Sequence, residues 1–199
     1  MKDSLNIAIA GATGYVGLEL IKILTIHPKA KIFYLCANKS VGKKIHNFDK
    51  TITNKNLPAI TKLNSINWNK INILFTALPD GEAHKISKKI PQHIKLIDLS
   101  GDFRLKDYKI YKKWYGIEHK SKNLINEAIY SITEFSKKHL NKFRIISCAG
   151  CYPTSVQIPL IPLVQKKMIN IKNIIIDSKS GYSGAGKNIK KKKKKKNLF

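Results

Sequence analysis

A glycine-rich turn between an apolar strand and a helix constrains the fold of this chain more than any other feature. Leu5 to Ala10 is an apolar run of strand length, followed at once by Gly11-Ala12-Thr13-Gly14-Tyr15-Val16-Gly17. Apolar residues then recur at helical spacing up to His27. A helix that opens inside a glycine run points its first N–H groups at a phosphate, so the pattern predicts a Rossmann-type dinucleotide-binding unit. The residues of the turn expected to contact the dinucleotide are Gly11, Thr13, Gly14, Tyr15, Val16 and Gly17.

The second predicted strand, Lys31 to Ala37, bears on the choice of dinucleotide. A site for NAD usually has an acid near the end of this strand, where it binds the ribose 2′-hydroxyl. Here the strand is followed by Asn38, Lys39 and Ser40, with no acid nearby. A cation and a hydroxyl suit a 2′-phosphate, so we predict NADP(H). Lysine is frequent throughout the chain, and the missing acid therefore carries more weight than Lys39.

Three further strands are predicted, and each ends at residues suited to a site. Ile71 to Ala77 runs into Leu78-Pro79-Asp80-Gly81 and a helical stretch, and Ile94 to Leu99 runs into Ser100-Gly101-Asp102-Phe103-Arg104. The run from Phe143 to Ser147 ends just before Cys151. Because the carboxyl ends of parallel strands meet at one edge, we expect an α/β fold with a mostly parallel sheet and one crevice.

Cys151 is placed for nucleophilic chemistry. It follows a predicted strand and begins a predicted helix, in Gly150-Cys151-Tyr152-Pro153-Thr154-Ser155. The N–H groups of a helix N-terminus favour a thiolate and could also stabilise the oxyanion formed when it attacks a carbonyl. The alternative is that this cysteine is a small hydrophobic residue of the core.

Six segments along the chain form a recognisable set: the glycine turn, Ala77-Leu78-Pro79, Asp98-Leu99-Ser100-Gly101-Asp102-Phe103-Arg104-Leu105, Trp114-Tyr115-Gly116, Gly150-Cys151-Tyr152-Pro153-Thr154 and Lys179-Ser180-Gly181-Tyr182-Ser183-Gly184-Ala185-Gly186. In this order they resemble the N-acetyl-γ-glutamyl-phosphate reductases, which are related to the aspartate-semialdehyde dehydrogenases. One departure is Cys148-Ala149, where many members carry asparagine and proline.

The resemblance implies an NADPH-dependent reduction of N-acetyl-γ-glutamyl phosphate to N-acetylglutamate 5-semialdehyde, a step of arginine biosynthesis. Cys151 would form a thioester with release of phosphate, and the thioester would then be reduced. Further contacts are implied for the substrate (Arg104, Tyr152 and Ser180) and for the cofactor (Leu78, Pro79, Ser183 and Gly184). A guanidinium can bind a phosphate or carboxylate bidentately, which suits Arg104. The resemblance and the composition together predict a cytoplasmic enzyme that forms a homo-oligomer when whole.

We expect three regions along the chain. Residues 1–146 form the NADP-binding domain, 147–187 begin an α+β catalytic and dimerisation domain, and 188–199 form a lysine-rich tail expected to be disordered. Family members are longer, and their catalytic histidine lies beyond the segment that matches Lys179 to Gly186, here called the second glycine segment. The six histidines here all precede Cys151, and we expect most of them to be exposed. We expect a C-terminal truncation, or a shifted reading frame at Lys190 to Lys196.

Other classes of function fit less well. The net charge of +26 suggests nucleic acid, but lysines are scattered, and no base-reading pattern accompanies them. No stretch is long enough to span a membrane. A single C-x-x-C, Cys148 to Cys151, provides too few ligands for zinc, so no metal is expected, although it leaves a dithiol oxidoreductase open. The remaining alternatives are a truncated protein that binds NADP without turnover, and an aspartate-semialdehyde dehydrogenase, which Tyr152-Pro153 disfavours.

Overall fold

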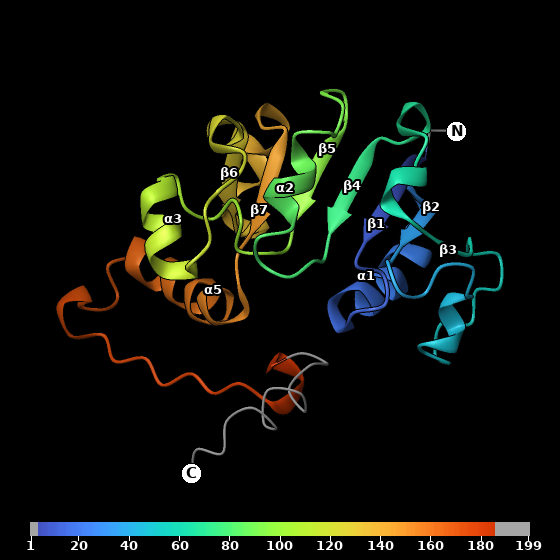
Figure 1. Cartoon of the computed structure of the whole chain (residues 1–199). Coiled ribbons are helices and arrows are strands. Elements are labelled where there is room, and N and C mark those ends of the chain that lie inside the picture. The colour runs from blue at the N-terminus through green and yellow to red at the C-terminus, as the bar shows by residue number, and fades with distance from the viewer. Residues whose placement is uncertain (1–3, 186–199) are drawn as a thin grey trace, which may run out of the picture.

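The computed structural model describes residues 4–185, and its centre is a seven-stranded sheet in which every neighbouring pair of described strands is parallel. The spatial order is β3-β2-β1-β4-β5-β7-β6 (Figure 1). The strands are β1 (Leu5–Ala10), β2 (Ala30–Cys36), β3 (Ile60–Thr61), β4 (Ile73–Thr76), β5 (Lys95–Asp98), β6 (Ala128–Ser131) and β7 (Ile145–Cys148). The helices are α1 (Tyr15–Thr25), α2 (Ala83–Ser87), α3 (Tyr108–Tyr115), α4 (Thr133–Ser136) and α5 (Cys151–Gln165).

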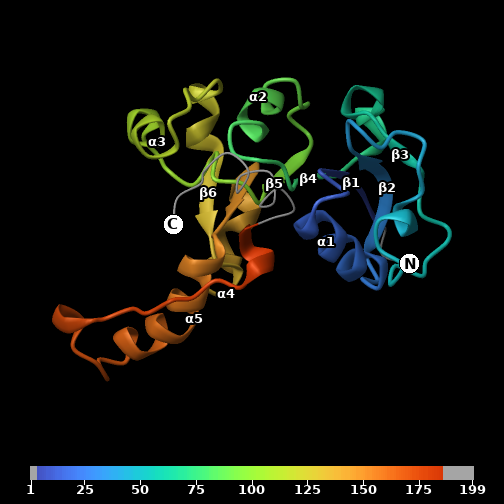
Figure 2. The same cartoon turned by 60° about the horizontal axis from the view of Figure 1, so that its bottom comes forward.

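The strand order reverses direction at β1, which lies between β2 and β4. In open parallel sheets a ligand crevice forms at such a switch point, outside the carboxyl ends of the strands. Figure 1 shows the strand arrowheads, the start of α1 and the start of α5 at this same edge. Figures 1 and 2 also show the segment after α5 returning from the end of that helix toward the middle of the sheet. The topology therefore gathers the predicted site loops at one edge.

Alternate residues of β1 pack into separate cores on the two faces of the sheet. Ile7 and Ile9 join a buried cluster with Leu18, Ile21 and Leu24 of α1. Ala8 and Ala10 face the other way, into a cluster that includes Ile90, Ile94, Phe103 and Leu124. A strand buried on both faces needs a continuous apolar run, and that requirement explains the sequence of β1.

The predicted strands are confirmed: β1 has the predicted bounds, β2 is shifted by one residue, and the other three are shorter than predicted. The parallel sheet confirms the fold class. The weakly patterned region from Ser121 to Lys142 contains one further strand, β6, which pairs with β7 at the sheet edge. The domain boundary expected after residue 146 falls inside β7, which pairs with both β5 and β6. Gly186, Lys187 and the tail 188–199 lie outside the described residues. Among residues 4–185, no helix combines the length and apolarity needed to cross a bilayer.

Four of the six histidines are exposed, as expected for most of them, and the other two, His84 and His119, are buried. His84 is 0% exposed and His119 is 2% exposed. The Nδ1 atom of each accepts a main-chain N–H, from Lys120 to His84 at 3.3 Å and from Ser121 to His119 at 3.2 Å. Each imidazole is therefore neutral with its proton on Nε2, and His119 Nε2 donates to the Asp102 carbonyl at 2.9 Å. The sequence did not indicate which two would be buried, because these rings are covered by segments distant in the chain.

Burial is the main reason why the pKa values of both imidazoles lie below their ordinary value of 6.5. His84 approaches His119 at 4.6 Å between ring centroids, and a charge on one would oppose a charge on the other. As the pH falls below 6.5, the unfolded chain binds protons at these positions that the folded chain does not. The histidines therefore stabilise the fold above that pH and lose this contribution as the pH falls toward their folded pKa values.

We predict that the difference in free energy of unfolding between the wild-type chain and His119→Gln, in favour of the wild type, becomes smaller as the pH falls. Glutamine can donate to Asp102 and accept from Ser121, but it does not titrate. Below pH 6.5 the free energy of unfolding of the wild type should fall relative to the variant by up to about 1.4 kcal/mol per pH unit. Urea denaturation of both proteins between pH 7.5 and 5 measures this difference, in which contributions from His84 and other shared groups largely cancel. A difference in free energy of unfolding that stays constant across this pH range would contradict a lowered pKa for His119 in the folded chain.

Candidate active site

The loops after β1, β2 and β4 enclose a cavity of about 500 Å³ at the switch point, which we call the nucleotide hollow. It brings together many of the residues predicted to contact the cofactor: Gly11, Thr13, Asn38, Lys39, Ser40, Leu78 and Pro79. These residues come from three loops separated by long stretches of sequence. The structure thus unites them as the parallel topology requires.

The glycines of the turn are needed for two different close approaches. Gly11 has φ +86°, and a Cβ atom there would overlap the carbonyl oxygen of Ala77 at the end of β4. A Cβ on Gly17 would overlap the main chain at Gly11 and Ala12, so Gly17 lets α1 pack closely beneath the turn. The missing side chain of Gly17 therefore allows the main chain of the turn to lie directly against α1.

Gly14 leaves room for a phosphate at the start of α1. It is the N-cap residue of that helix, and no side chain caps the helix there. A Cβ on Gly14 would meet just one heavy atom within 4 Å, the Gly11 carbonyl oxygen at 3.4 Å. The space above the helix N-terminus is open, and the dipole of α1 favours an anion in it. The turn consequently fits the pyrophosphate of a dinucleotide.

Four of the remaining predicted cofactor residues line a second hollow, of about 830 Å³, beside α1, whereas Gly14 and Gly17 line neither hollow. Tyr15 and Val16 contribute from the first turn of α1, and Ser183 and Gly184 contribute from the segment after α5. The rest of its surface is mostly apolar, with Leu20, Ile23 and Phe48 among its lining, although the acidic Glu19 and Asp49 also line it. The second glycine segment thus lies opposite the start of α1, as its predicted cofactor role requires.

Cys151 is the first residue of α5 and is exposed. Gly150 caps the helix, and its carbonyl accepts the Thr154 N–H at 3.0 Å. A third hollow, of about 580 Å³ and here called the thiol hollow, is lined by Cys151, Tyr152, Ser155, Asp177, Ser178, Lys179, Ser180, Gly181, Ser183 and Gly184. It shares Ser183 and Gly184 with the hollow beside α1, so the thiol and the first turn of α1 face adjoining spaces.

Arg104 lies behind the turn that joins Cys148 at the end of β7 to Cys151 at the start of α5, here called the cysteine turn. Its Nε donates to the Cys148 carbonyl at 2.9 Å, and its Nη2 donates to the Leu99 carbonyl at 3.2 Å. A Cβ on Gly150 would lie 3.1 Å from Nη1. Arg104 is absent from the lining of the thiol hollow, and two of its donors join the carboxyl ends of β5 and β7. The structure thus shows Arg104 bracing the turn that carries Cys151.

The three cysteines differ in environment, and all carry free thiols. Burial raises the pKa of Cys36 to about 12. Burial also raises the pKa of Cys148 to about 11, with Asp98 adding to the effect and Arg104 opposing it. Because the thiolate is the reactive form, Cys148 is a poor partner for the dithiol chemistry that the C-x-x-C spacing allowed. Cys151 stands apart as the exposed thiol at a helix N-terminus.

Three charged residues near the nucleotide hollow were not predicted. Glu82 lines the hollow, and Lys62 and Lys89 line a neighbouring cavity that shares Asn38, Leu63 and Ile86 with it. Lysine is so frequent in this chain that no local signal distinguishes these two. Within the described part of the chain, no cluster of three or more histidine, cysteine, aspartate or glutamate residues is arranged to hold a metal ion.

Sequence comparison identifies the two parts of the chain. Residues 6–143 match the family described as semialdehyde dehydrogenase, NAD binding domain, and residues 151–198 match the semialdehyde dehydrogenase dimerisation domain. A protein of Ehrlichia canis named N-acetyl-gamma-glutamyl-phosphate reductase is 44% identical over 96% of this chain and 55% of its own length. A probable chloroplastic reductase of the same name from Oryza sativa is 38% identical over 94% of this chain and 45% of its own length. The chain spans about half the length of the curated relatives it matches.

Solved structures share the fold. An aspartate semialdehyde dehydrogenase II of Vibrio cholerae superposes with a TM-score of 0.70 at 19% identity, covering 94% of this chain and 49% of its own. An aspartate semialdehyde dehydrogenase with NADP from Candida albicans gives a TM-score of 0.54 at 22% identity, covering 82% of this chain and 48% of its own. The sequence match over residues 6–143 covers more than half of the chain. The chain belongs to the semialdehyde dehydrogenase family.

Proposed function

We propose that this chain is part of an NADPH-dependent reductase that converts N-acetyl-γ-glutamyl phosphate to N-acetylglutamate 5-semialdehyde, a step of arginine biosynthesis. The relatives at 38–44% identity carry the name of that enzyme. The observation that carries the proposal is that an exposed thiol at a helix N-terminus opens on a space adjoining the hollow beside the first turn of α1, where the glycine turn ends. Covalent catalysis at a thiol beside a dinucleotide site suits the reduction of an activated acyl group.

NADP(H) would be held along the carboxyl edge of the sheet. The pyrophosphate would lie over Gly14 at the N-terminus of α1, and the 2′-phosphate would face Lys39 and Ser40 across the nucleotide hollow. Leu78 and Pro79 would form the opposite wall. The segment with Ser183 and Gly184 would lie on the nicotinamide side, nearer Cys151. When bound, NADPH supplies the hydride of the reaction.

Cys151 would attack the acyl phosphate through its thiolate. A bond forms between Sγ and the acyl carbon, the carbon–oxygen bond to phosphate breaks, and inorganic phosphate leaves with the bonding electrons. The N–H groups at the start of α5 would stabilise the oxyanion of this step. After reduction, the thiohemiacetal at Cys151 collapses to the aldehyde and the thiolate, which restores the enzyme. Splitting the reaction at a thioester replaces one difficult step with two easier ones.

Tyr152 and Ser180 would contact the substrate from the walls of the thiol hollow. Arg104 would act differently from a simple clamp, because two of its donors are held by the carbonyls of Cys148 and Leu99. Its remaining Nη1, beside Gly150, would present positive charge to the phosphate or carboxylate of the substrate. The guanidinium would thereby support the cysteine turn and attract the anionic substrate.

A second candidate function is binding of NADP without turnover. Among the described residues that line the thiol hollow there is no histidine, and His84 and His119 are instead buried against Asp102. Loss of a general acid or base typically costs 10²–10⁴-fold in rate. This candidate predicts normal binding of NADPH together with negligible reductase activity, which the experiments below separate from the first proposal.

The proposed whole protein is a cytoplasmic homo-oligomer. Residues 151–198 match a dimerisation domain, and none of the fifteen residues of α5 is buried although most are apolar. A helix that is apolar around its circumference normally packs inside a larger core. We expect the rest of the catalytic domain and a second subunit to cover it. The proposed partner is a small acyl phosphate, and neither a nucleic acid nor a membrane is part of the proposal.

Replacing Cys151 with serine should separate binding from chemistry. In the protein made from its complete reading frame, Cys151→Ser should lower turnover by at least about a thousandfold, because a hydroxyl is a far weaker nucleophile at neutral pH. The Kd for NADPH should stay within about twofold of the wild type. The matched variant Cys148→Ser should retain most of the activity. Steady-state kinetics and NADPH fluorescence titration test both, and undiminished turnover in Cys151→Ser would refute the nucleophile.

Reversing the charge of Lys39 should weaken NADPH selectively. Lys39→Glu places a carboxylate beside the proposed 2′-phosphate and should raise the Kd for NADPH by at least about tenfold. The Kd for NADH, which has no 2′-phosphate, should change by less than about threefold. Lys43→Glu carries the same charge change in the same loop outside the nucleotide hollow and serves as the control. Equal losses for both nucleotides would exclude the 2′-phosphate role.

A further inference from the structure

Two loops at the carboxyl edge of the sheet exchange hydrogen bonds in a reciprocal pattern. Asp80, after β4, accepts a hydrogen bond at Oδ1 from the Gly101 N–H at 2.7 Å. Asp102, after β5, accepts one at Oδ1 from the Gly81 N–H at 2.6 Å. Each aspartate is the neighbour in sequence of the glycine that donates to the other. We call this arrangement, formed by Asp80, Gly81, Gly101 and Asp102, the aspartate clasp.

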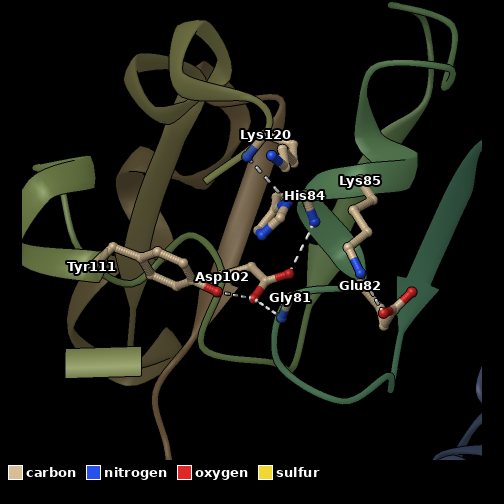
Figure 3. Close-up of polar contacts among 7 residues, drawn as sticks. All are labelled: Gly81, Glu82, His84, Lys85, Asp102, Tyr111 and Lys120. Carbon is tan, nitrogen blue, oxygen red and sulfur yellow. Dashed lines mark hydrogen bonds and ion pairs between the residues drawn. The ribbon is translucent and has the colours of Figure 1, made fainter. Parts of the chain in front are cut away.

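The Asp102 half of the clasp is buried, and Figure 3 shows the hydrogen bonds that hold its carboxylate. Asp102 is 0% exposed, and it also accepts the Tyr111 hydroxyl at 2.7 Å and the His84 N–H at 2.9 Å. Its main-chain carbonyl accepts His119 Nε2. A carboxylate away from water is tolerated where donors surround it, and here they fix its position. The Gly81 N–H, and with it the end of the β4 loop, is thereby tied to a rigid point.

Both donors of the clasp are glycines for steric reasons. Gly81 has φ +90°, which other residues rarely adopt. A Cβ on Gly101 would overlap the ring of Tyr115 in α3. The two loops can therefore approach closely enough for main-chain N–H groups to reach the opposing carboxylates. Steric fit and hydrogen bonding thus select the same residues.

The clasp lies between two parts of the proposed site. The β4 loop also carries Leu78 and Pro79, which form a wall of the nucleotide hollow. The β5 loop also carries Arg104, which braces the Cys148 carbonyl just before the cysteine turn. Asp80 itself is exposed and does not line the nucleotide hollow. Any effect of Asp80 on cofactor binding must therefore pass through the position of the loop.

We infer that Asp80 and Asp102 are positioning residues that hold the β4 loop in the conformation that binds NADP(H). The inference rests on the cofactor site proposed above. With the clasp closed, Leu78 and Pro79 stand in place before the cofactor arrives, and little binding energy is used to order the loop. With the clasp open, the cofactor must pay that ordering cost, and its affinity falls.

The test uses the exposed half, because removing the buried Asp102 could unfold the protein. Asp80→Ala should raise the Kd for NADPH about three- to tenfold, the range for one lost hydrogen bond. Asp80→Asn removes the same charge but retains an oxygen that accepts the Gly101 N–H, so its Kd should stay within about twofold of the wild type. This rescue distinguishes the hydrogen bond from a change in net charge. Fluorescence titration of NADPH into the 199-residue chain measures all three.

Asp107→Ala is the matched control. Asp107 follows in the same loop, and its Oδ1 accepts the Lys109 N–H at 2.6 Å at the start of α3. Its removal deletes the same charge and the same type of bond without opening the clasp, so the Kd for NADPH should not change. Hydrogen–deuterium exchange without cofactor should show that the Gly101 N–H exchanges faster in Asp80→Ala than in the wild type. In Asp107→Ala the same N–H should exchange at the wild-type rate.

The outcomes distinguish the two proposals. A wild-type chain that fails to bind NADPH would refute the cofactor site itself, whatever the exchange data show. Normal wild-type binding with an unchanged Kd in Asp80→Ala would overturn the positioning role alone. A Kd raised equally in Asp80→Ala and Asp80→Asn would also overturn it, because charge would then be responsible.

Discussion

The close approach of the Gly11 main chain to the end of β4 is the contact on which the rest of the crevice depends. Gly11 leaves β1 in a conformation with positive φ, at a place where any side chain would overlap the Ala77 carbonyl. This contact brings the glycine turn, Gly11 to Gly17, against the β4 loop at the point where the strand order reverses. The two loops can approach this closely because Gly11 has no side chain to meet the Ala77 carbonyl.

The second requirement is that loops at an open sheet edge be held without a continuous apolar core. Here buried polar groups provide the connection: Asp102 collects three donors at its carboxylate, and the carbonyl of the same residue accepts His119. Arg104 performs a similar task two residues later, by joining the carboxyl ends of β5 and β7. Both sets of bonds are made by the loop after β5. This loop therefore connects the β4 loop, which lines the nucleotide hollow, with the cysteine turn.

Features determined by local sequence could be predicted, and features determined by distant contacts could not. The glycine turn, the strands near the switch point and the helix at Cys151 follow from apolar runs and the residues that interrupt them. The burial of His84 and His119 depends on neighbours that fold in from other segments. The bracing role of Arg104 depends on the carbonyl of Cys148, 44 residues away. The clasp was equally invisible, since its two halves lie about 20 residues apart in sequence.

The central claim is that Cys151 accepts an acyl group beside a nucleotide site, and peptide mapping of the acylated protein tests it most directly. The chain would be incubated with N-acetyl-γ-glutamyl phosphate without NADPH, then digested and analysed by mass spectrometry. The account predicts an acyl adduct on Cys151, with one inorganic phosphate released per adduct and unmodified thiols at Cys36 and Cys148. An adduct on Cys148, or phosphate release without any adduct on Cys151, would contradict it.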